Sequence, residues 1–384
     1  MANILDYLQW RGDIPFYADP FNEIDALILS QFGYVPLDGI VPTDFSRAIT
    51  VENAYKRYSP ERIPESVRFI SFEQDNQLFR LMAESERFKD ILLTGYVNMI
   101  DTSEEVQFSA VTCTLGDDTR FISFRGTDGS VVGWKEDFSI AYLQQTPGQL
   151  YSVGYINENF SQTSPPLRIG GHSKGGNLAI YASAFADEAL RSRIMEVYSF
   201  DGPGFREEIT DSAEYADVSE KVRCFVPESS VVGMLLNNSL PQTIVKSSVN
   251  GIMQHLAYNW ELLRNRFVCA DELSKSGDLI NKTITGWLDK TITGWLDDFS
   301  DEERRVLTDT LFAVLEAPEK DTLKEILKGK WSAYSSMFKA MRKLSPEQQT
   351  VLKDAVKKIA KSGKNAIMPD KEKPPAITMK NAET

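Results

Sequence analysis

The chain has 384 residues, a formal net charge of −13, three cysteines and two histidines. Proteins that bind nucleic-acid backbones rely on clustered Lys and Arg, so this charge argues against a general nucleic-acid-binding protein. Cys113, Cys224 and Cys269 are too far apart for a disulfide framework or a paired zinc site, and two histidines argue against a His-rich metal centre. The length predicts two or three domains, or one large α/β domain with an appendage.

The N-terminal segment, residues 1–20, is mixed polar and acidic and lacks the basic, apolar and small-residue order of a signal peptide. No stretch approaches the roughly 18 consecutive apolar residues that span a bilayer. We therefore expect a cytoplasmic protein with reduced thiols.

The first part of the chain predicts two helices, at 46–58 and 72–88, whose pattern indicates no function. The period then changes to that of strands. Residues 91–100 are apolar and β-branched, 106–114 alternate in character, and 120–124 form a third apolar run after a polar turn. These three segments predict an antiparallel meander.

After the meander, strand and helix patterns alternate, as a parallel sheet with crossover helices requires. The predicted elements are an amphipathic, alanine-rich helix at 177–190 and strands at 167–170, 195–200, 222–226 and 243–245. The fold class is therefore α/β, with an antiparallel meander that leads into a mostly parallel sheet with flanking helices. We place this domain at residues 1–266.

Residues 267–384 are charged and predict a helical extension. Ser300-Asp301-Glu302-Glu303 is a capping box before an apolar helical period, and Pro318 ends that helix. Ser345 begins a second helix of this kind, with Pro346 at its first position.

Two further features lie in this extension. The sequence KTITGWLD occurs at 282–289 and again at 290–297, too few and too short for a solenoid, so we interpret it as a local duplication. Residues 339–384 contain 11 Lys and Arg against 5 Asp and Glu, a net of +6, which leaves −19 for the rest of the chain. Such a tail is usually a solvated helix face, and a weak contact with an anionic membrane surface is the alternative.

The strongest chemical signal is Gly171-His172-Ser173-Lys174-Gly175, between a predicted strand and a predicted helix. This is the setting of a nucleophile elbow, in which a strained strand-to-helix turn lifts the serine Oγ above the sheet. Glycines flank the serine because side chains would collide there. A glycine-rich turn with a solvent-facing serine is the alternative.

A second motif, Arg125-Gly126-Thr127-Asp128-Gly129, follows the third strand of the meander. A hydrolase with such an elbow places its oxyanion donors in this loop. We predict that Thr127 supplies its backbone N–H and its hydroxyl, and that the backbone N–H of Lys174 supplies the other donor. A surface turn is the alternative.

The sequence Phe-Arg-Gly-Thr at 124–127, followed by Trp134 and Asp137 and then the elbow, resembles the fungal-type, or class three, lipases of the α/β-hydrolase superfamily. The likeness covers roughly residues 90–265 and implies the α/β-hydrolase fold and a Ser-His-acid mechanism, without naming a substrate. The chain departs from these lipases at Lys174, where they usually have Leu, and this change places a cation beside the predicted nucleophile.

The whole chain resembles an uncharacterised family of bacterial lipase-like hydrolases. The segments that carry this second resemblance are residues 3–6, 12–13, 201–205 and 254–255.

A serine nucleophile needs a base, and the chain order of this fold is serine, acid, histidine. His172 precedes the serine inside the elbow, where its side chain would point away from Oγ and pack under the turn. His255 is then the only imidazole left, in a loop after the last predicted strand. We predict His255 as the base.

Two carboxylates compete for the third place of the triad. Asp201 follows the strand at 195–200, 28 residues after Ser173, and a Gly-Pro-Gly turn would hold it at the carboxyl edge of the sheet. Glu228 follows the next strand, the commoner acid position, where Ser230 is the nearest match to the Asp of class three lipases. Lipases of the pancreatic type have their acid after strand six, in an Asp-Pro turn that Asp201 resembles. We favour Asp201 and keep Glu228 as the alternative.

These residues predict a serine esterase or lipase that acts on small-molecule or lipid esters through an acyl-enzyme, without a metal or cofactor. The apolar run at 231–236 is interpreted either as a buried segment or as a lid or acyl-chain site. The competing class is a catalytically inactive binding or scaffolding protein, because a fold does not determine a function.

Overall fold

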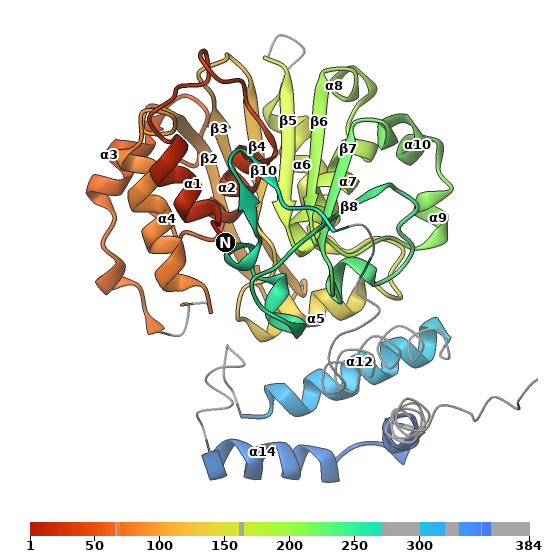
Figure 1. Cartoon of the computed structure of the whole chain (residues 1–384). Helices are drawn as coiled ribbons and strands as arrows, with labels where there is room; N and C mark the ends of the chain where they lie inside the picture. Colours follow the sequence, from red (N-terminus) through yellow and green to blue (C-terminus); the bar gives the residue numbers. More distant parts are fainter. Residues whose placement is uncertain are drawn as a thin grey trace, which may run out of the picture.

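The computed structural model describes residues 1–65, 68, 70–160, 165–270, 273, 300–318, 330–346 and 348–354. At its centre lies an eight-stranded sheet whose strands follow one another in chain order (Figure 1). The strands are β1 (Ile49–Thr50), β2 (Leu92–Asp101), β3 (Val106–Thr114), β4 (Arg120–Phe124), β5 (Leu167–His172), β6 (Ile194–Phe200), β7 (Val222–Pro227) and β8 (Gln242–Val245). β1 to β4 pair antiparallel and β4 to β8 pair parallel, which confirms the predicted meander and parallel sheet.

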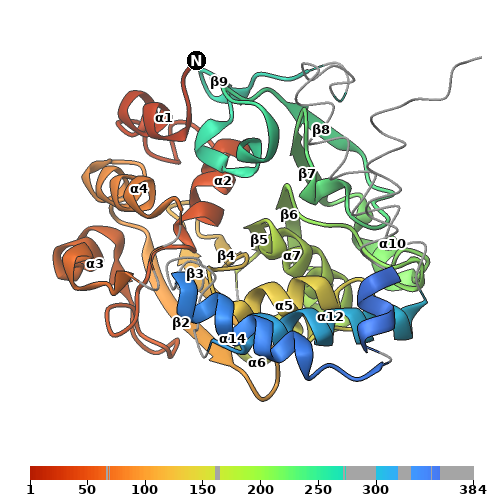
Figure 2. The same cartoon turned by 90° about the horizontal axis from the view of Figure 1, so that it is seen from below.

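Helices cover both faces of this sheet (Figure 2). One face carries α1 (Ile4–Arg11), α2 (Glu23–Phe32) and α4 (Phe72–Glu84), and the other carries α6 (Pro147–Asn159) and α7 (Lys174–Phe185). Because side chains alternate along a strand, Phe121 of β4 packs into the core under α2 and its neighbour Ile122 into the core under α7. The carboxyl ends of the parallel strands meet at one edge of the sheet.

Two of the predicted helices have different bounds in the structure. The helix expected at 46–58 is α3 (Val51–Arg57), because the preceding residues pair with β2 and the Thr50 hydroxyl caps the helix. The helix expected at 72–88 ends with α4, where Ser85 takes an extended conformation.

The third predicted helix, at 177–190, begins earlier than expected, directly after Ser173, and is divided into α7 and α8 (Glu188–Arg191). α1, α2, α6 and α5 (Val131–Ser139) were not predicted. The shorter elements are η1 (Pro60–Arg62), α9 (Glu207–Thr210), α10 (Ala213–Ser219), η3 (Val232–Met234), η4 (Gly251–His255), η5 (Ala257–Asn259), β9 (Leu262–Leu263) and β10 (Arg266–Phe267).

The C-terminal part contains α12 (Asp301–Glu316), which begins at the predicted capping box, and α14 (Lys330–Arg342). Both helices lie beyond α5, below the sheet in Figure 1. α12 packs on α5 through the rings of Phe312 and Phe138, 5.7 Å apart, and through an ion pair of 3.4 Å between Asp309 and Lys135.

Several sequence features fall beyond this description. The duplication at 282–297 and the basic tail from residue 355 onward lie outside the described residues. The division into 1–266 and 267–384 stays a prediction. In the part of the chain that is described, no helix has the length and apolar character needed to cross a bilayer.

Candidate active site

The segment that carries Ser173 is a sharp turn from β5 into α7. Ser173 has φ 58° and ψ −134°, a backbone conformation that a residue with a side chain adopts only when its surroundings enforce it. Gly175 makes the turn possible, because a Cβ at this position would lie 2.1 Å from the carbonyl oxygen of Phe124. The serine thus stands in a strained elbow at the carboxyl end of β5.

His255 and Asp201 meet at the same edge of the sheet. The Nδ1–H of His255 donates a hydrogen bond of 2.6 Å to Oδ2 of Asp201. The His255 side chain is 22% exposed and that of Asp201 is fully buried. This bond fixes the tautomer, so Nε2 is the nitrogen of His255 that can accept a proton. Among the described hydrogen bonds and ion pairs, none joins the Glu228 carboxylate to His255.

The second oxygen of the Asp201 carboxylate, Oδ1, also accepts hydrogen bonds. Its Oδ1 accepts a hydrogen bond from the Ser230 hydroxyl and another, of 3.1 Å, from the backbone N–H of Gly233. Asp201 itself has a positive φ of 51° and donates its N–H to the carbonyl of Phe225 at 2.8 Å. Ser230, the nearest match to the Asp of class three lipases, is therefore a support for Asp201, a role that the sequence did not indicate.

His172 packs against His255, with the two ring centroids 4.6 Å apart. Burial, and then the neighbouring His255, lower the pKa of His172 to about 3, so its imidazole is neutral. Its Nε2–H donates to the carbonyl oxygen of His255 at 2.6 Å, and its Nδ1 accepts from the Tyr34 hydroxyl at 3.2 Å. The His172 side chain is buried, and its contacts with His255 and Tyr34 were not predicted from the sequence.

Gln254 anchors the loop that carries His255. Its amide oxygen accepts from the N–H of Ser229 at 2.9 Å, and its amide nitrogen donates to the carbonyl of Val249 at 2.9 Å. Its own carbonyl accepts from the Trp260 indole at 2.7 Å. The backbone beside the imidazole is thus fixed on both sides.

The loop that contains Thr127 lies against the elbow, because a Cβ built on Gly126 would be 3.0 Å from the Cβ of Ser173. The Thr127 hydroxyl donates to the Asp137 carboxylate, with oxygen distances of 2.6 and 2.7 Å. A hydroxyl carries one hydrogen, so in this state only the backbone N–H of Thr127 can serve an oxyanion. Burial raises the pKa of Asp137 to about 6.

The side chain of Lys174 is turned into the protein interior. Its Nζ donates to Oε2 of Glu136 at 2.7 Å, and also to the backbone and side-chain oxygens of Gln107 at 2.8 and 2.9 Å. The cation that the sequence places beside the predicted nucleophile is therefore paired with Glu136 in the interior, a partner that the sequence did not indicate. These hydrogen bonds involve Nζ only, and the backbone N–H of Lys174 lies at the start of α7.

Three apolar side chains are partly exposed on segments that carry or contact the candidate residues. Trp134 of α5 is 39% exposed, Met253 lies two residues before His255 and is 44% exposed, and Met234, beside Gly233, is 36% exposed. The run at 231–236 is thus only partly buried.

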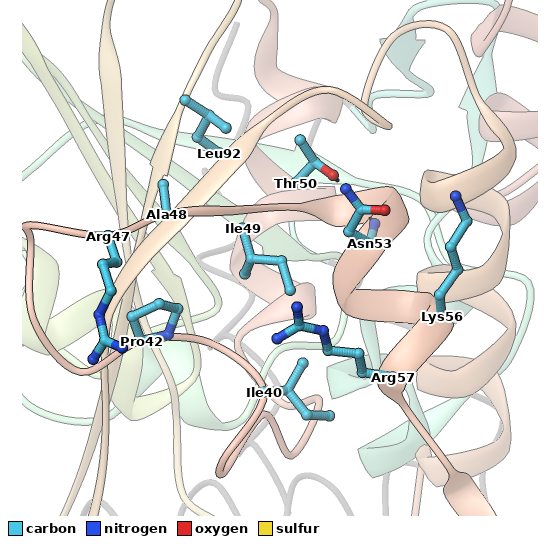
Figure 3. Close-up of a pocket in the computed structure, with 10 residues that line it drawn as sticks. All are labelled: Ile40, Pro42, Arg47, Ala48, Ile49, Thr50, Asn53, Lys56, Arg57 and Leu92. Atoms are coloured by element: carbon cyan, nitrogen blue, oxygen red, sulfur yellow. Dashed lines mark hydrogen bonds between the residues drawn. The ribbon is translucent and has the colours of Figure 1, made fainter.

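A cavity of about 650 Å³ lies elsewhere, at the edge of the sheet beside β1 and α3 (Figure 3). Ile40 and Ile49 contribute apolar side chains to it, and the Arg57 guanidinium reaches toward both. β1 stands four places from β5 in the sheet order, and no member of the candidate triad lines this cavity. It is therefore separate from the candidate active site.

Three solved structures that match the chain at low identity are lipases. The M37 lipase is 14% identical with a TM-score of 0.36, over 56% of this chain and 70% of that lipase. The Rhizomucor miehei lipase propeptide complex is 20% identical with a TM-score of 0.30, over 41% of this chain and 57% of the other. The extracellular lipase LipA from Serratia marcescens is 13% identical with a TM-score of 0.28, over 56% of this chain and 40% of that lipase.

The profile of the Mbeg1-like family matches residues 82–313, which include the Thr127 loop, the elbow and the His255 loop. No curated protein matches the chain. The sheet itself, antiparallel to β4 and parallel beyond it with a serine elbow after β5, is that of the α/β hydrolases. The prediction of this fold and of a lipase-like family is confirmed.

Proposed function

This chain belongs to the Mbeg1-like family, and from that membership together with its α/β-hydrolase fold we propose that it is a serine hydrolase of carboxylic esters. Ser173 is the proposed nucleophile, His255 the base and Asp201 the acid. The observation that carries the proposal is the hydrogen bond of 2.6 Å between His255 and Asp201 at the sheet edge where Ser173 occupies a strained elbow.

The proposed reaction begins when the Ser173 hydroxyl attacks the ester carbonyl and Nε2 of His255 takes its proton. Asp201 holds the imidazole and stabilises its charged form. The backbone N–H groups of Thr127 and Lys174 donate to the oxyanion of the tetrahedral intermediate. His255 then protonates the leaving alcohol, an acyl-enzyme remains on Ser173, and a water activated by the same imidazole releases the acid.

The surroundings of the triad favour an ester with an apolar part. Trp134 lies on α5, which contacts Thr127 through Asp137, Met234 follows Gly233, which donates to Asp201, and Met253 precedes His255 by two residues; all three side chains are partly exposed. Methionine side chains adapt to ligands of irregular shape, and exposed apolar side chains suit the binding of an acyl chain. A small-molecule or lipid ester is therefore the proposed substrate class.

Labelling with a fluorophosphonate probe tests the proposal. We expect the probe to label the native protein at one site, and to label neither Ser173→Ala nor His255→Ala, since attack needs both the hydroxyl and the base. Circular dichroism must show that both variants are folded. A folded native protein that the probe does not label would contradict the proposal and favour a binding protein.

The length of the acyl chain separates an esterase from a lipase. A series of p-nitrophenyl esters from acetate to palmitate measures this preference directly. If the apolar side chains bind the acyl chain, kcat/KM rises with length up to a limit, and Trp134→Ala lowers it more for long esters than for acetate. Equal losses for all esters would remove the acyl-chain assignment.

A further inference from the structure

Two consecutive carboxylates of α5 reach the two residues that supply the proposed oxyanion donors. Glu136 binds the Lys174 ammonium at 2.7 Å, and Asp137 accepts the Thr127 hydroxyl at 2.6 and 2.7 Å. One helix therefore contacts the oxyanion site from both sides. A leucine at position 174 could not make the first of these contacts, because it has no ammonium group for Glu136 to bind. The contact of Asp137 with Thr127 does not involve position 174.

The Glu136 carboxylate is a junction between four elements of the fold. Besides Lys174 of α7, it accepts the backbone N–H of Gln107 in β3 at 3.1 Å and that of Gly148 in α6 at 2.6 Å. Its side chain is fully buried and that of Lys174 is 1% exposed. An ammonium has three hydrogens, and Glu136 with the two oxygens of Gln107 accepts all of them.

A buried ion pair is not the most stabilising way to fill the protein interior. Taking two charges out of water costs free energy that their attraction only partly returns, and apolar residues of similar volume are often equally or more stabilising. The pair instead fixes the orientation of its two side chains, because charge-assisted hydrogen bonds hold both partners in one geometry. Lys174 follows the nucleophile directly, so this geometry is imposed at the elbow.

We propose that the ion pair of Glu136 and Lys174 positions the oxyanion hole, with Glu136 as a positioning residue that acts through Lys174. The inference rests on the proposed function. The pair holds α5 against the first turn of α7, which fixes the backbone N–H of Lys174 and keeps Asp137 in reach of Thr127. From its outer face, α5 is held by α12 through Phe138 and Lys135.

Steady-state hydrolysis of p-nitrophenyl butyrate tests the positioning role. We expect Glu136→Gln and Lys174→Met to lower kcat about 10- to 100-fold, because misplaced donors fail in the transition state, and to change KM less than about twofold. Rates are divided by the fraction of protein that a fluorophosphonate labels to completion. An unchanged kcat in both folded variants would overturn the proposal.

The matched control is the ion pair of Arg87 and Asp25, 2.5 Å long and also fully buried, on the side of the sheet that carries α2. Asp25→Asn is expected to lower the melting temperature while kcat per labelled site stays within about twofold of the native value. A loss of kcat equal to that of Glu136→Gln would show a general effect of buried charges and overturn the assignment.

The neutral double variant Lys174→Met/Glu136→Gln separates positioning from stability. Without a lone buried charge, it is expected to melt at a higher temperature than Lys174→Met, yet to keep the lowered kcat. Recovery of kcat together with the melting temperature would assign the pair to stability alone and overturn the proposal.

Amide hydrogen exchange gives a readout that needs no substrate. In Glu136→Gln we expect faster exchange in both α5 and the Thr127 loop, and in Asp25→Asn no change there. If the native protein proved inactive, the proposed function would fail, while this measurement would still decide whether the pair holds α5. Unchanged exchange in Glu136→Gln would overturn the inference in either case.

Discussion

The two sides of Ser173 are built on different principles. On the base side, His255 and Asp201 come from loops after separate strands, and their side chains meet directly at 2.6 Å. On the oxyanion side, Thr127 and Lys174 offer backbone N–H groups, and their side chains point to carboxylates of α5. Side-chain chemistry performs the proposed reaction on the first side and only holds the backbone in place on the second.

This difference determines how sensitive each side is to substitution. A base or acid that is removed takes a step out of the mechanism, whereas a positioning side chain that is removed leaves the donor present but displaced. We therefore expect large losses on the base side, intermediate losses on the oxyanion side, and the smallest losses among residues that support the acid.

The largest effect is expected at the acid. Asp201→Asn lowers kcat about 10³- to 10⁴-fold, because an amide can no longer hold His255 in its productive tautomer or stabilise its charge. Glu228→Gln is the matched control and keeps kcat within about twofold. The measurement is p-nitrophenyl butyrate hydrolysis by the folded variants. A large loss in Glu228→Gln with none in Asp201→Asn would move the acid to the end of β7.

An intermediate effect with a pH signature is expected at Asp137. Its pKa is raised to about 6, so the carboxylate is charged above that pH and neutral below it. The charged form accepts the Thr127 hydroxyl more strongly. Asp137→Asn is neutral at every pH, so native kcat/KM should exceed that of the variant about 10-fold at pH 8 and approach it at pH 5.

The ratio of native to variant kcat/KM is the useful quantity, because effects of pH that both proteins share cancel in it. The ratio should fall with decreasing pH through a midpoint near 6, the raised pKa of Asp137. A ratio that stays constant from pH 5 to pH 8 would show that the charge of Asp137 has no part in holding the loop.

The same difference explains what the sequence could predict. The sheet was predictable because strands leave apolar runs and alternating patterns in the sequence, and His255 could be proposed as the base because only one imidazole remained outside the elbow. α5 was missed, since its fully buried Glu136 interrupts the apolar face that marks an amphipathic helix.

Positioning contacts were missed for a related reason. Tyr34 and His172 are 138 residues apart in the chain, and Lys174 and Glu136 are 38 apart. Neither contact follows from local pattern or from a catalytic requirement for a residue type. That His255 bonds to Asp201 likewise depends on the three-dimensional course of two loops.

The smallest effect is expected at Ser230, whose hydroxyl donates to Oδ1 of Asp201. Ser230→Ala leaves that oxygen the N–H of Gly233, and leaves His255 on the other oxygen, so kcat falls only about threefold to tenfold. Ser230→Thr retains a hydroxyl and is the matched control. Because the serine acts only through the carboxylate, its substitution should have no further effect on the residual kcat of Asp201→Asn. A loss in the double variant as large as in Ser230→Ala alone would show that the Ser230 hydroxyl acts on the reaction by a route other than the Asp201 carboxylate. The base side would then also depend on a side chain that acts by positioning, as the oxyanion side does.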